Sequence, residues 1–288
     1  FRVSEPILRR IARKIVGEDL AKKLWKRIEI VGDIAIIRKP FDIEIDVFKP
    51  IAEEILKELK YVKSVWLAIS PVRGDHRVRE YLHLAGEYRS ETIYREHGCS
   101  FLLDIRRVYI SPVLSYDHMR TARMVARGER ILNMFAGIGG YTVVISKHAK
   151  PSYVVSIDIN EYAIRYLKKN LELNGIESFN DVIHGDALSL TEGMPEGSFD
   201  RVLAPLPELV YEALPRAVHI VKDGGIVHLH FFVEAPRKSK AIDEACRVLF
   251  ELTTSIGLRV RMEVRGGHVI RSIGPRKYHV VLDVIVFK

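Results

Sequence analysis

The chain has 288 residues and a formal net charge of +8, with 48% hydrophobic residues. This length predicts two domains that can each bury a core. The absence of an apolar run of about 18 residues, and of a signal peptide, argues against membrane association and for a cytoplasmic location. Two cysteines, Cys99 and Cys246, exclude a disulfide framework and a metal cage, and they fit a reducing compartment.

The positive charge favours a polyanionic partner, nucleic acid first. Its distribution supports this interpretation, although a generally basic protein with scattered charges is the alternative. The basic residues gather at positions 9–14, 22–27, 120–130 and 259–277.

Residues 1–110 predict a small α+β domain of short strands and one or two helices. A helical pattern over 3–27 is broken near Gly17, and residues 28–37 form two apolar pieces around a Gly32-Asp33 turn. The remaining predicted elements are an amphipathic helix at 47–59, a strand at 62–69, a loop at 71–75, and strands at 82–85, 92–96 and 99–108.

Residues 111–288 predict an α/β domain with a Rossmann-like, doubly wound and mostly parallel sheet. A connector at 109–114 leads to Ser115, the expected N-cap of a helix over 116–126. Only residues 266–277 separate the last two strands, so these should pair antiparallel. The predicted strands are 131–134, 153–157, 181–184, 199–204, 225–233, 258–264 and 278–287; the helices are 141–149, 161–174 (capped by Asn160 and closed by Gly175), 207–221 and 238–256.

The centre of this domain is a glycine turn between a buried strand and a helix. Gly137 and Gly139 let the backbone approach a ligand, and the first N–H groups of the following helix point at the turn. The next strand ends in Asp158, about 20 residues past the glycines, where an acid suits a ribose hydroxyl pair. A plain strand–turn–helix with tightly packed glycines is the structural alternative.

The glycine spacing distinguishes two classes of cofactor. A dinucleotide fingerprint needs a third glycine at position 142, which is Thr142, so an oxidoreductase is disfavoured. The segment from Phe135 and Ala136 through Gly139 instead resembles the first motif of class I methyltransferases, which bind S-adenosylmethionine.

Ligands of such sheets bind at the carboxyl ends of the strands. Ile159 follows Asp158 there, and Asp186 with Ala187 follows the third strand, where the acid could accept a hydrogen bond from adenine. Asp186 could equally be a helix N-cap or turn acid. The fourth strand ends in Ala204, Pro205, Leu206 and Pro207, where a methyl acceptor usually lies; helix initiation is the alternative for the prolines.

From roughly residue 20 to its end, the chain resembles the archaeal and eukaryotic type of tRNA guanine-37 N1-methyltransferase. The motifs that carry the resemblance begin at Arg77, Tyr94, Val108, Phe135, Ile157, Ile226 and Tyr278. The resemblance implies S-adenosylmethionine as methyl donor, S-adenosylhomocysteine as product, and the anticodon stem-loop as substrate. It also implies RNA recognition by the small domain. The tRNA-elbow domain that usually precedes it is expected to be absent or truncated. We expect a monomer and no metal site.

Two departures from the family pattern matter. The family's catalytic Glu falls on Asp117, and its usual Arg partners fall on Val113 and His118. The fourth-strand motif, usually Asn-Leu-Pro, begins here with Pro205. A proline there resembles the archaeal subgroup that also methylates C7 of 4-demethylwyosine at the same tRNA position.

These correspondences give each site residue an expected role. Asp117 is the candidate base for the proton of guanine N1, or alternatively a first-turn acid of its helix. Arg77 would stabilise the charge on O6, or else contact phosphate or pair with Glu80. Pro205 and Pro207 complete the catalytic set. The predicted RNA contacts are Arg77, Arg79, His118 and Arg120.

Two other functions remain open. The His228-x-His230 pattern is shared with an aminocarboxypropyl transferase of similar fold, which takes a different carbon chain from the same cofactor. A tRNA-binding relative whose catalytic residues have drifted is the non-enzymatic alternative. Tyr141, His118 and Phe231 could wall the acceptor pocket or pack in the core.

Overall fold

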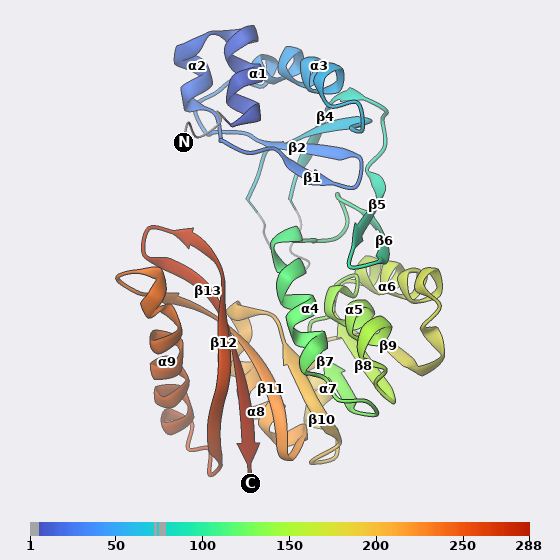
Figure 1. Cartoon of the computed structure of the whole chain (residues 1–288), viewed down its shortest axis with the longest axis vertical. Coiled ribbons are helices and arrows are strands. Elements are labelled where there is room, and N and C mark those ends of the chain that lie inside the picture. The colour runs from blue at the N-terminus through green and yellow to red at the C-terminus, as the bar shows by residue number, and fades with distance from the viewer. Residues whose placement is uncertain (1–5, 72–73, 75–78) are drawn as a thin grey trace. The chain divides into compact units, whose positions relative to one another are not determined.

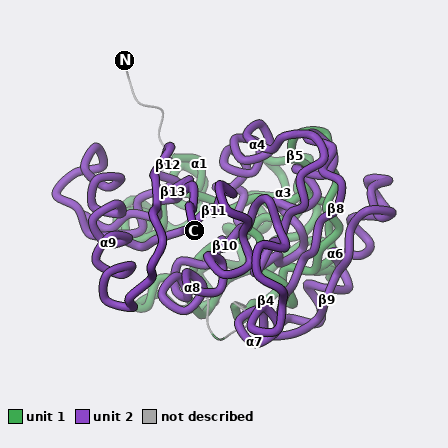
Figure 2. Tube along the Cα trace, turned by 90° about the horizontal axis from the view of Figure 1, so that it is seen from below, with its two compact units in different colours: residues 1–110 green, residues 111–288 purple. Residues whose placement is uncertain are grey.

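The computed structural model describes residues 6–71, 74 and 79–288. The chain divides into two compact units, residues 1–110 and 111–288, each shown in its own colour in Figure 2. In the part of the chain that is described, no helix is both long and apolar enough to cross a membrane.

Unit 1 packs three helices on a four-stranded sheet of order β1-β2-β3-β4 (Figure 1). Gly17, with φ of +83°, separates the first two helices, as the sequence predicted. Leu8, Ile11, Phe48 and Ile55 are fully buried between helices and sheet. The helices are α1 (Ile7–Val16), α2 (Glu18–Lys23) and α3 (Phe48–Glu58); the strands are β1 (Glu29–Val31), β2 (Ile34–Arg38), β3 (Ser64–Ala68) and β4 (Tyr81–Gly86). A separate antiparallel ribbon contains β5 (Glu91–Glu96) and β6 (Cys99–Asp104).

Unit 2 contains a seven-stranded sheet of order β12-β13-β11-β10-β7-β8-β9. Its strands are β7 (Arg130–Asn133), β8 (Tyr153–Asp158), β9 (Asn180–His184), β10 (Phe199–Ala204), β11 (Val221–Glu234), β12 (Arg261–Gly274) and β13 (Lys277–Phe287). The strands from β11 to β9 run parallel, whereas β13 is antiparallel to both β11 and β12. The predicted Rossmann-like sheet with its antiparallel last pair is confirmed. The strand order reverses between β7 and β10, which is where such sheets bind ligands.

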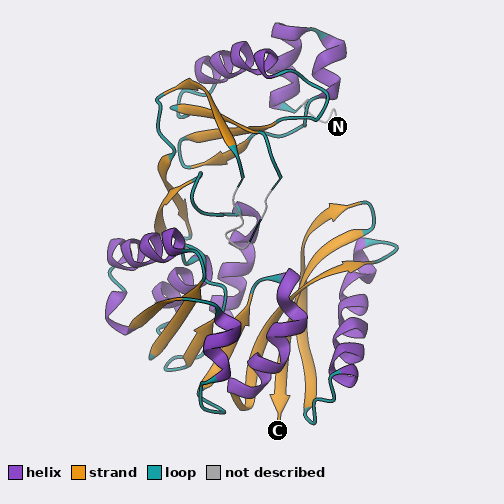
Figure 3. Cartoon of the chain, turned by 180° about the vertical axis from the view of Figure 1, so that it is seen from behind, coloured by secondary structure: helices purple, strands orange, loops and turns teal. Residues whose placement is uncertain are grey.

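Helices cover both faces of this sheet (Figure 3). One face carries α4 (Ser115–Met124), α5 (Gly140–Ala149) and α6 (Glu161–Asn174); the other carries α7 (Ala187–Glu192), α8 (Val210–Ile220) and α9 (Ala241–Ser255). Leu229 and Phe231 of β11 are buried in the core against α8 and α9. Because strand side chains alternate, His228, His230 and Phe232 face the α4 side.

The structure corrects two predicted boundaries. Ser115 is not the N-cap but the first residue of α4, because a 3₁₀ turn over Pro112–Leu114 already starts the helix and Leu114 is the cap. Residues 266–274 are not a connection. They continue β12, and only residues 275–276 turn the chain into β13. The glycines in this stretch are accommodated by register shifts in the ladder. Helix α7 was not predicted at all.

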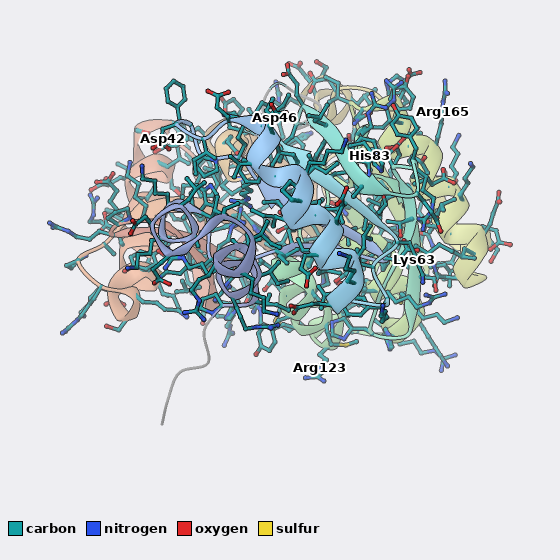
Figure 4. All side chains as sticks on the ribbon, turned by 90° about the horizontal axis from the view of Figure 1, so that it is seen from above. Asp42, Asp46, Lys63, His83, Arg123 and Arg165 are labelled. Carbon is teal, nitrogen blue, oxygen red and sulfur yellow. The ribbon has the colours of Figure 1, made fainter. Side chains whose placement is uncertain are left out.

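Part of the positive charge is neutralised locally. Arg10 and Lys14 both pair with Glu58, at 2.6 and 2.7 Å. Arg123 and Arg165 point outward in Figure 4, and the Arg165 side chain, 66% exposed, pairs with Glu161. The pairs of Arg10 and Lys14 agree with the scattered-charge alternative for the cluster at 9–14.

Candidate functional site

The turn after β7 needs glycine at two positions for different reasons. Gly139 caps α5 with φ of +97°, and a Cβ there would lie 2.3 Å from Cδ1 of Leu167. Gly137 also has a positive φ, +55°, but a Cβ built on it meets no described atom within 4 Å. The backbone of Gly137 therefore borders open space, as close approach of a ligand requires.

Asp158 lies directly beside this turn. Its Oδ2 accepts a hydrogen bond of 2.7 Å from the N–H of Gly137, and its Oδ1 accepts one of 2.9 Å from Asn160. The N–H of Ala136 donates to the carbonyl of Ile157 at 2.9 Å, which ties the two strand ends together. Ile159, next to the acid, keeps an apolar side chain 40% exposed. The structure thus brings Asp158 and Ile159 to the glycine turn, and their roles in cofactor binding remain predictions.

Asp186 has a structural role of its own. It is the N-cap of α7, and its carboxylate accepts hydrogen bonds from the backbone of Leu188 and from both N–H and hydroxyl of Ser189. The Ser189 hydroxyl is the main cause that lowers the pKa of Asp186. This is the N-cap alternative considered above, and Ala187 is buried behind it.

The proline segment follows β10 at the same end of the sheet. Ala204 is fully buried, and Leu203 accepts a hydrogen bond of 3.0 Å from the N–H of Met134, the residue before the glycine turn. Pro207 starts a short 3₁₀ turn over Pro207–Leu209, so helix initiation describes its local role. Pro205 is half-buried between β10 and this turn.

Asp117 lies in the first turn of α4 and is 1% exposed. Its Oδ1 accepts a hydrogen bond of 2.7 Å from Nε of Arg120, and its Oδ2 accepts one of 2.6 Å from the hydroxyl of Tyr141. Burial, and then the Asp117 carboxylate, raise the pKa of Tyr141 well above its usual value. The phenol is therefore a donor to Asp117 rather than a base.

Arg120 extends this contact into the sheet. Its guanidinium donates two hydrogen bonds to Asp283 of β13, at 2.6 and 3.0 Å, and Asp283 accepts a third from Nδ1 of His228 at 2.7 Å. Burial alone would raise the pKa of Asp283, but His228 and Arg120 hold it well below its usual range.

A second arginine fixes the tautomer of His228. Nε2 of His228 lies 2.7 Å from a guanidinium nitrogen of Arg201, whose other nitrogens donate to Glu129 at 2.7 and 3.0 Å. Arginine cannot accept a hydrogen bond, so Nε2 must be the acceptor and Nδ1 must carry the proton given to Asp283. Burial is the main cause that lowers the pKa of His228, which keeps the ring neutral.

Tyr141 also connects to a histidine pair. Its oxygen lies 3.2 Å from Nε2 of His230, and Nδ1 of His230 lies 2.8 Å from Nε2 of His279. Because the Tyr141 proton is given to Asp117, His230 donates from Nε2 and accepts at Nδ1 from His279. Burial, with His228 and Arg120 nearby, lowers the pKa of His230 to about 3.

This network was not predicted from the sequence, although three signals of it are present there. Asp117 and Arg120 are spaced i, i+3 on one helix, and His228 and His230 alternate with apolar residues on one strand. Asp283 lies within the last predicted strand, where an acid is unexpected unless it is paired.

These contacts change the expectations for two predicted RNA contacts. His118 is 6% exposed, and its ring lies where a Cβ on Gly140 would come within 2.5 Å of it. Arg120 is held by Asp117 and Asp283. Both side chains make contacts inside unit 2, and an RNA contact from either remains a prediction. His118, Tyr141 and Phe231 pack inside the unit rather than on an open wall.

The two predicted arginines of unit 1 differ. Arg77 lies outside the described residues. Arg79 forms an ion pair of 3.2 Å with Glu29, and its side chain is only 13% exposed. Burial would lower the pKa of Arg79, but Glu29 raises it. An ion pair therefore accounts for Arg79 without RNA.

Comparison with known families identifies both halves of the chain. Residues 92–257 match the family described as the TRM5/TYW2 methyltransferase domain. Residues 8–90 match the TYW2 N-terminal domain.

Three relatives span nearly the whole chain. It is 42% identical to the tRNA 4-demethylwyosine(37)-methyltransferase Taw21 of Saccharolobus solfataricus, over 91% of this chain and 94% of Taw21. It is 34% identical to the tRNA (guanine(37)-N(1))-methyltransferase Trm5b of Pyrococcus abyssi, over 98% and 84%. It is 29% identical to the tRNA(Phe) (4-demethylwyosine(37)-C(7)) aminocarboxypropyltransferase of Pyrococcus horikoshii, over 99% and 98%.

Solved structures of relatives from the same family also match this chain. The crystal structure of Trm5b from Pyrococcus abyssi matches with a TM-score of 0.82 at 33% identity, covering 100% of this chain and 82% of that one. A complex of aTrm5 with tRNALeu matches at 0.81 and 30%, covering 98% and 79%. Pyrococcus horikoshii TYW2 in complex with MeSAdo matches at 0.76 and 28%, covering 99% and 100%.

Proposed function

The chain belongs to the TRM5/TYW2 methyltransferase family, and we propose that it transfers the methyl group of S-adenosylmethionine to the purine at position 37 of tRNA. The main observation in favour of this cofactor is the Asp158 carboxylate, which lies 2.7 Å from the N–H of Gly137 at the switch point of the sheet. Solved relatives in complex with MeSAdo and with adenosine support the same cofactor.

The cradle around Gly137 fits this group. Gly137 borders open space, Asp158 offers carboxylate oxygens beside it, and Ile159 presents an exposed apolar side chain. Asp158 would accept hydrogen bonds from the ribose hydroxyls, and Ile159 would cover one face of the adenine. When bound, S-adenosylmethionine supplies an electrophilic methyl group on its sulfonium.

For the acceptor we propose C7 of 4-demethylwyosine first and N1 of guanosine second. The greater identity to Taw21, 42% against 34% for Trm5b, supports this order. Pro205 in place of the family's usual asparagine supports it as well. In either transfer C7 or N1 gains the methyl group as its bond to the sulfonium breaks and S-adenosylhomocysteine is left, and the proton displaced from C7 or N1 passes to water. The fixed φ of Pro205 and Pro207 gives a rigid rim to the place where the acceptor lies.

In this proposal Asp117 does not act as the base but holds other residues in position. Its side chain is 1% exposed, and its two oxygens accept hydrogen bonds from Arg120 and Tyr141, so the contacts of Asp117 are made inside unit 2. We therefore propose a positioning role, in which Asp117 anchors α4 to the first turn of α5. Arg77 remains the candidate cation for the acceptor oxygen.

The small domain and the assembly complete the proposal. Unit 1 matches the TYW2 N-terminal domain, so we propose that it contacts the anticodon stem-loop. We also propose that the chain is a monomer in the cytoplasm. Light scattering at increasing protein concentration measures the oligomeric state.

Aminocarboxypropyl transfer is the second candidate function. The His228-x-His230 strand and 29% identity to the Pyrococcus horikoshii transferase support it. It would move the other carbon chain of the same cofactor to C7.

One experiment separates these activities. The purified chain is given tRNA with guanosine or 4-demethylwyosine at position 37, with cofactor labelled in the methyl or in the carboxyl carbon. Mass spectrometry of the nucleoside then gives the product. We expect methyl label in 4-demethylwyosine tRNA; carboxyl label would identify the second candidate, and neither label would indicate a catalytically inactive relative.

A further inference from the structure

Phe232 is an exposed aromatic ring beside the acceptor end of the sheet. It is 40% exposed on the α4 side of β11, whereas its neighbours Phe231 and Val233 are buried on the other side. Leu229 is the partner of Ala204 in the parallel ladder. Phe232 comes three residues later, so it lies at the same end as the proline segment after β10.

The Phe232 ring is backed by buried, hydrogen-bonded histidines. It makes an edge-to-face contact with His279, at 5.3 Å between ring centroids. His279 is bonded to His230, and His230 to Tyr141 at the start of α5. A ring supported in this way loses little conformational entropy when a ligand stacks on it.

Three arginines lie at the same end of the sheet as Phe232. Arg271 lies directly opposite His279 in the β12–β13 ladder. Arg276 lies in the turn between these strands, and its carbonyl accepts a hydrogen bond of 2.9 Å from Ala235, just after β11. Arg237 follows in the same loop. In Figure 1 the β12–β13 turn and the end of β11 lie at one end of the sheet.

These cations differ from the paired ones on the helices. Within the described residues, the side chains of Arg237, Arg271 and Arg276 make no ion pair or hydrogen bond. The nearby acid Glu234 is already paired with Lys277 at 3.1 Å. The surface therefore offers an aromatic face with surplus positive charge, which is the combination that binds single-stranded nucleic acid.

We propose that Phe232 and Arg271 bind an unstacked nucleotide of the RNA loop next to the target purine. The base stacks on Phe232, and a phosphate pairs with Arg271. This inference rests on the proposed function, because it names the surface by which unit 2 holds the RNA substrate.

The test uses the full chain and an anticodon stem-loop with 2-aminopurine at position 36 or 38. Phe232→Ala should weaken binding about five- to 150-fold, since stacking contributes roughly 1–3 kcal/mol per base. It should also remove the quenching of 2-aminopurine, whereas Phe232→Tyr should keep both. Arg271→Gln should lower the slope of log affinity against log salt by about 0.7.

Two matched controls occupy other parts of unit 2. Phe250→Ala removes a 73% exposed phenylalanine from α9, on the opposite face of the sheet. Arg259→Gln removes an exposed arginine just before β12, at the other end of that strand. Neither should change binding. Calorimetry with S-adenosylhomocysteine should give wild-type affinity for every variant, which verifies folding.

The outcomes are separable. Suppose that Phe232→Ala binds the stem-loop and quenches 2-aminopurine as Phe250→Ala does, while the wild-type chain methylates tRNA. The stacking surface is then refuted and the proposed function stands. If the wild-type chain neither binds nor modifies tRNA, both fail. Loss of binding and quenching by Phe232→Ala alone supports the proposal.

Discussion

The hydroxyl of Tyr141 donates a hydrogen bond of 2.6 Å to Oδ2 of Asp117. This contact joins the first turn of α5, which follows the glycine turn, to the first turn of α4. The position of the proposed cofactor turn is thus coupled to a helix that carries no cofactor residue.

Tyr141→Phe tests this coupling. The change leaves Oδ2 of Asp117 and Nε2 of His230 without their shared partner in a buried site, so we expect a loss of about 1–3 kcal/mol in the free energy of unfolding. Urea denaturation at neutral pH measures it. Tyr211→Phe, at a 58% exposed position on α8, is the matched control and should change little. Equal stabilities of the two variants would contradict a structural role for the phenol.

Asp117→Asn should be more damaging than Tyr141→Phe. It weakens two hydrogen bonds to the carboxylate, from Arg120 and from Tyr141, and a hydrogen bond to a charged group contributes roughly 1.5–3 kcal/mol, whereas Asp283 keeps Arg120 paired. Thermal unfolding gives the stability, and single-turnover methylation gives the rate. A variant with wild-type stability, normal tRNA affinity and a slow rate would instead restore Asp117 as the base.

Gly137→Ala and Gly139→Ala should separate ligand binding from packing. Both positions have positive φ, so each change costs about 1 kcal/mol in backbone strain. Gly139→Ala adds a clash with Leu167, whereas a Cβ on Gly137 meets no described atom. We expect Gly137→Ala to fold with little loss of melting temperature and to bind S-adenosylhomocysteine poorly. The opposite order of melting temperatures would refute this assignment of roles.

Asp158→Ala should weaken S-adenosylhomocysteine binding about ten- to 150-fold, because hydrogen bonds to charged groups contribute roughly 1.5–3 kcal/mol. Calorimetry measures the affinity. Asp181→Ala on β9 serves as the control, since its carboxylate is bonded to Tyr153 and not to the glycine turn. An unchanged affinity for Asp158→Ala would remove Asp158 from the site.

The buried histidines predict how stability depends on pH. The pKa of His230 is about 3 in the folded chain and about 6.5 in the unfolded chain, so the unfolded state takes up the proton first as the pH falls. Its stabilising contribution is therefore complete above about pH 6.5 and is lost on acidification toward pH 3, by up to about 1.4 kcal/mol per pH unit. His228, whose pKa is also lowered, acts in the same direction.

Urea denaturation between pH 7 and pH 4 measures this dependence. His230→Gln removes one titrating group, so its stability should fall less steeply with acid than that of the wild-type chain. Parallel curves would show that His230 does not carry the dependence.

Local sequence patterns determined much of this protein. The glycine turn, Asp158 at the end of the next strand, and the Asn160 cap of α6 follow from spacing along one continuous segment, and the structure contains all three features. The antiparallel final pair followed from a connection too short for a helix. These features depend on neighbours in the chain, which a sequence displays directly.

Tertiary structure decided which polar residues meet. Asp283 reaches Arg120 across 163 positions, and this contact depends on the register of β13 against β11, where Asp283 pairs with His228. A shift of one residue would move these side chains to the other face, because strand side chains alternate. The same alternation exposes Phe232 and buries Phe231. Sequence alone gives the alternation, but only packing determines which face is covered.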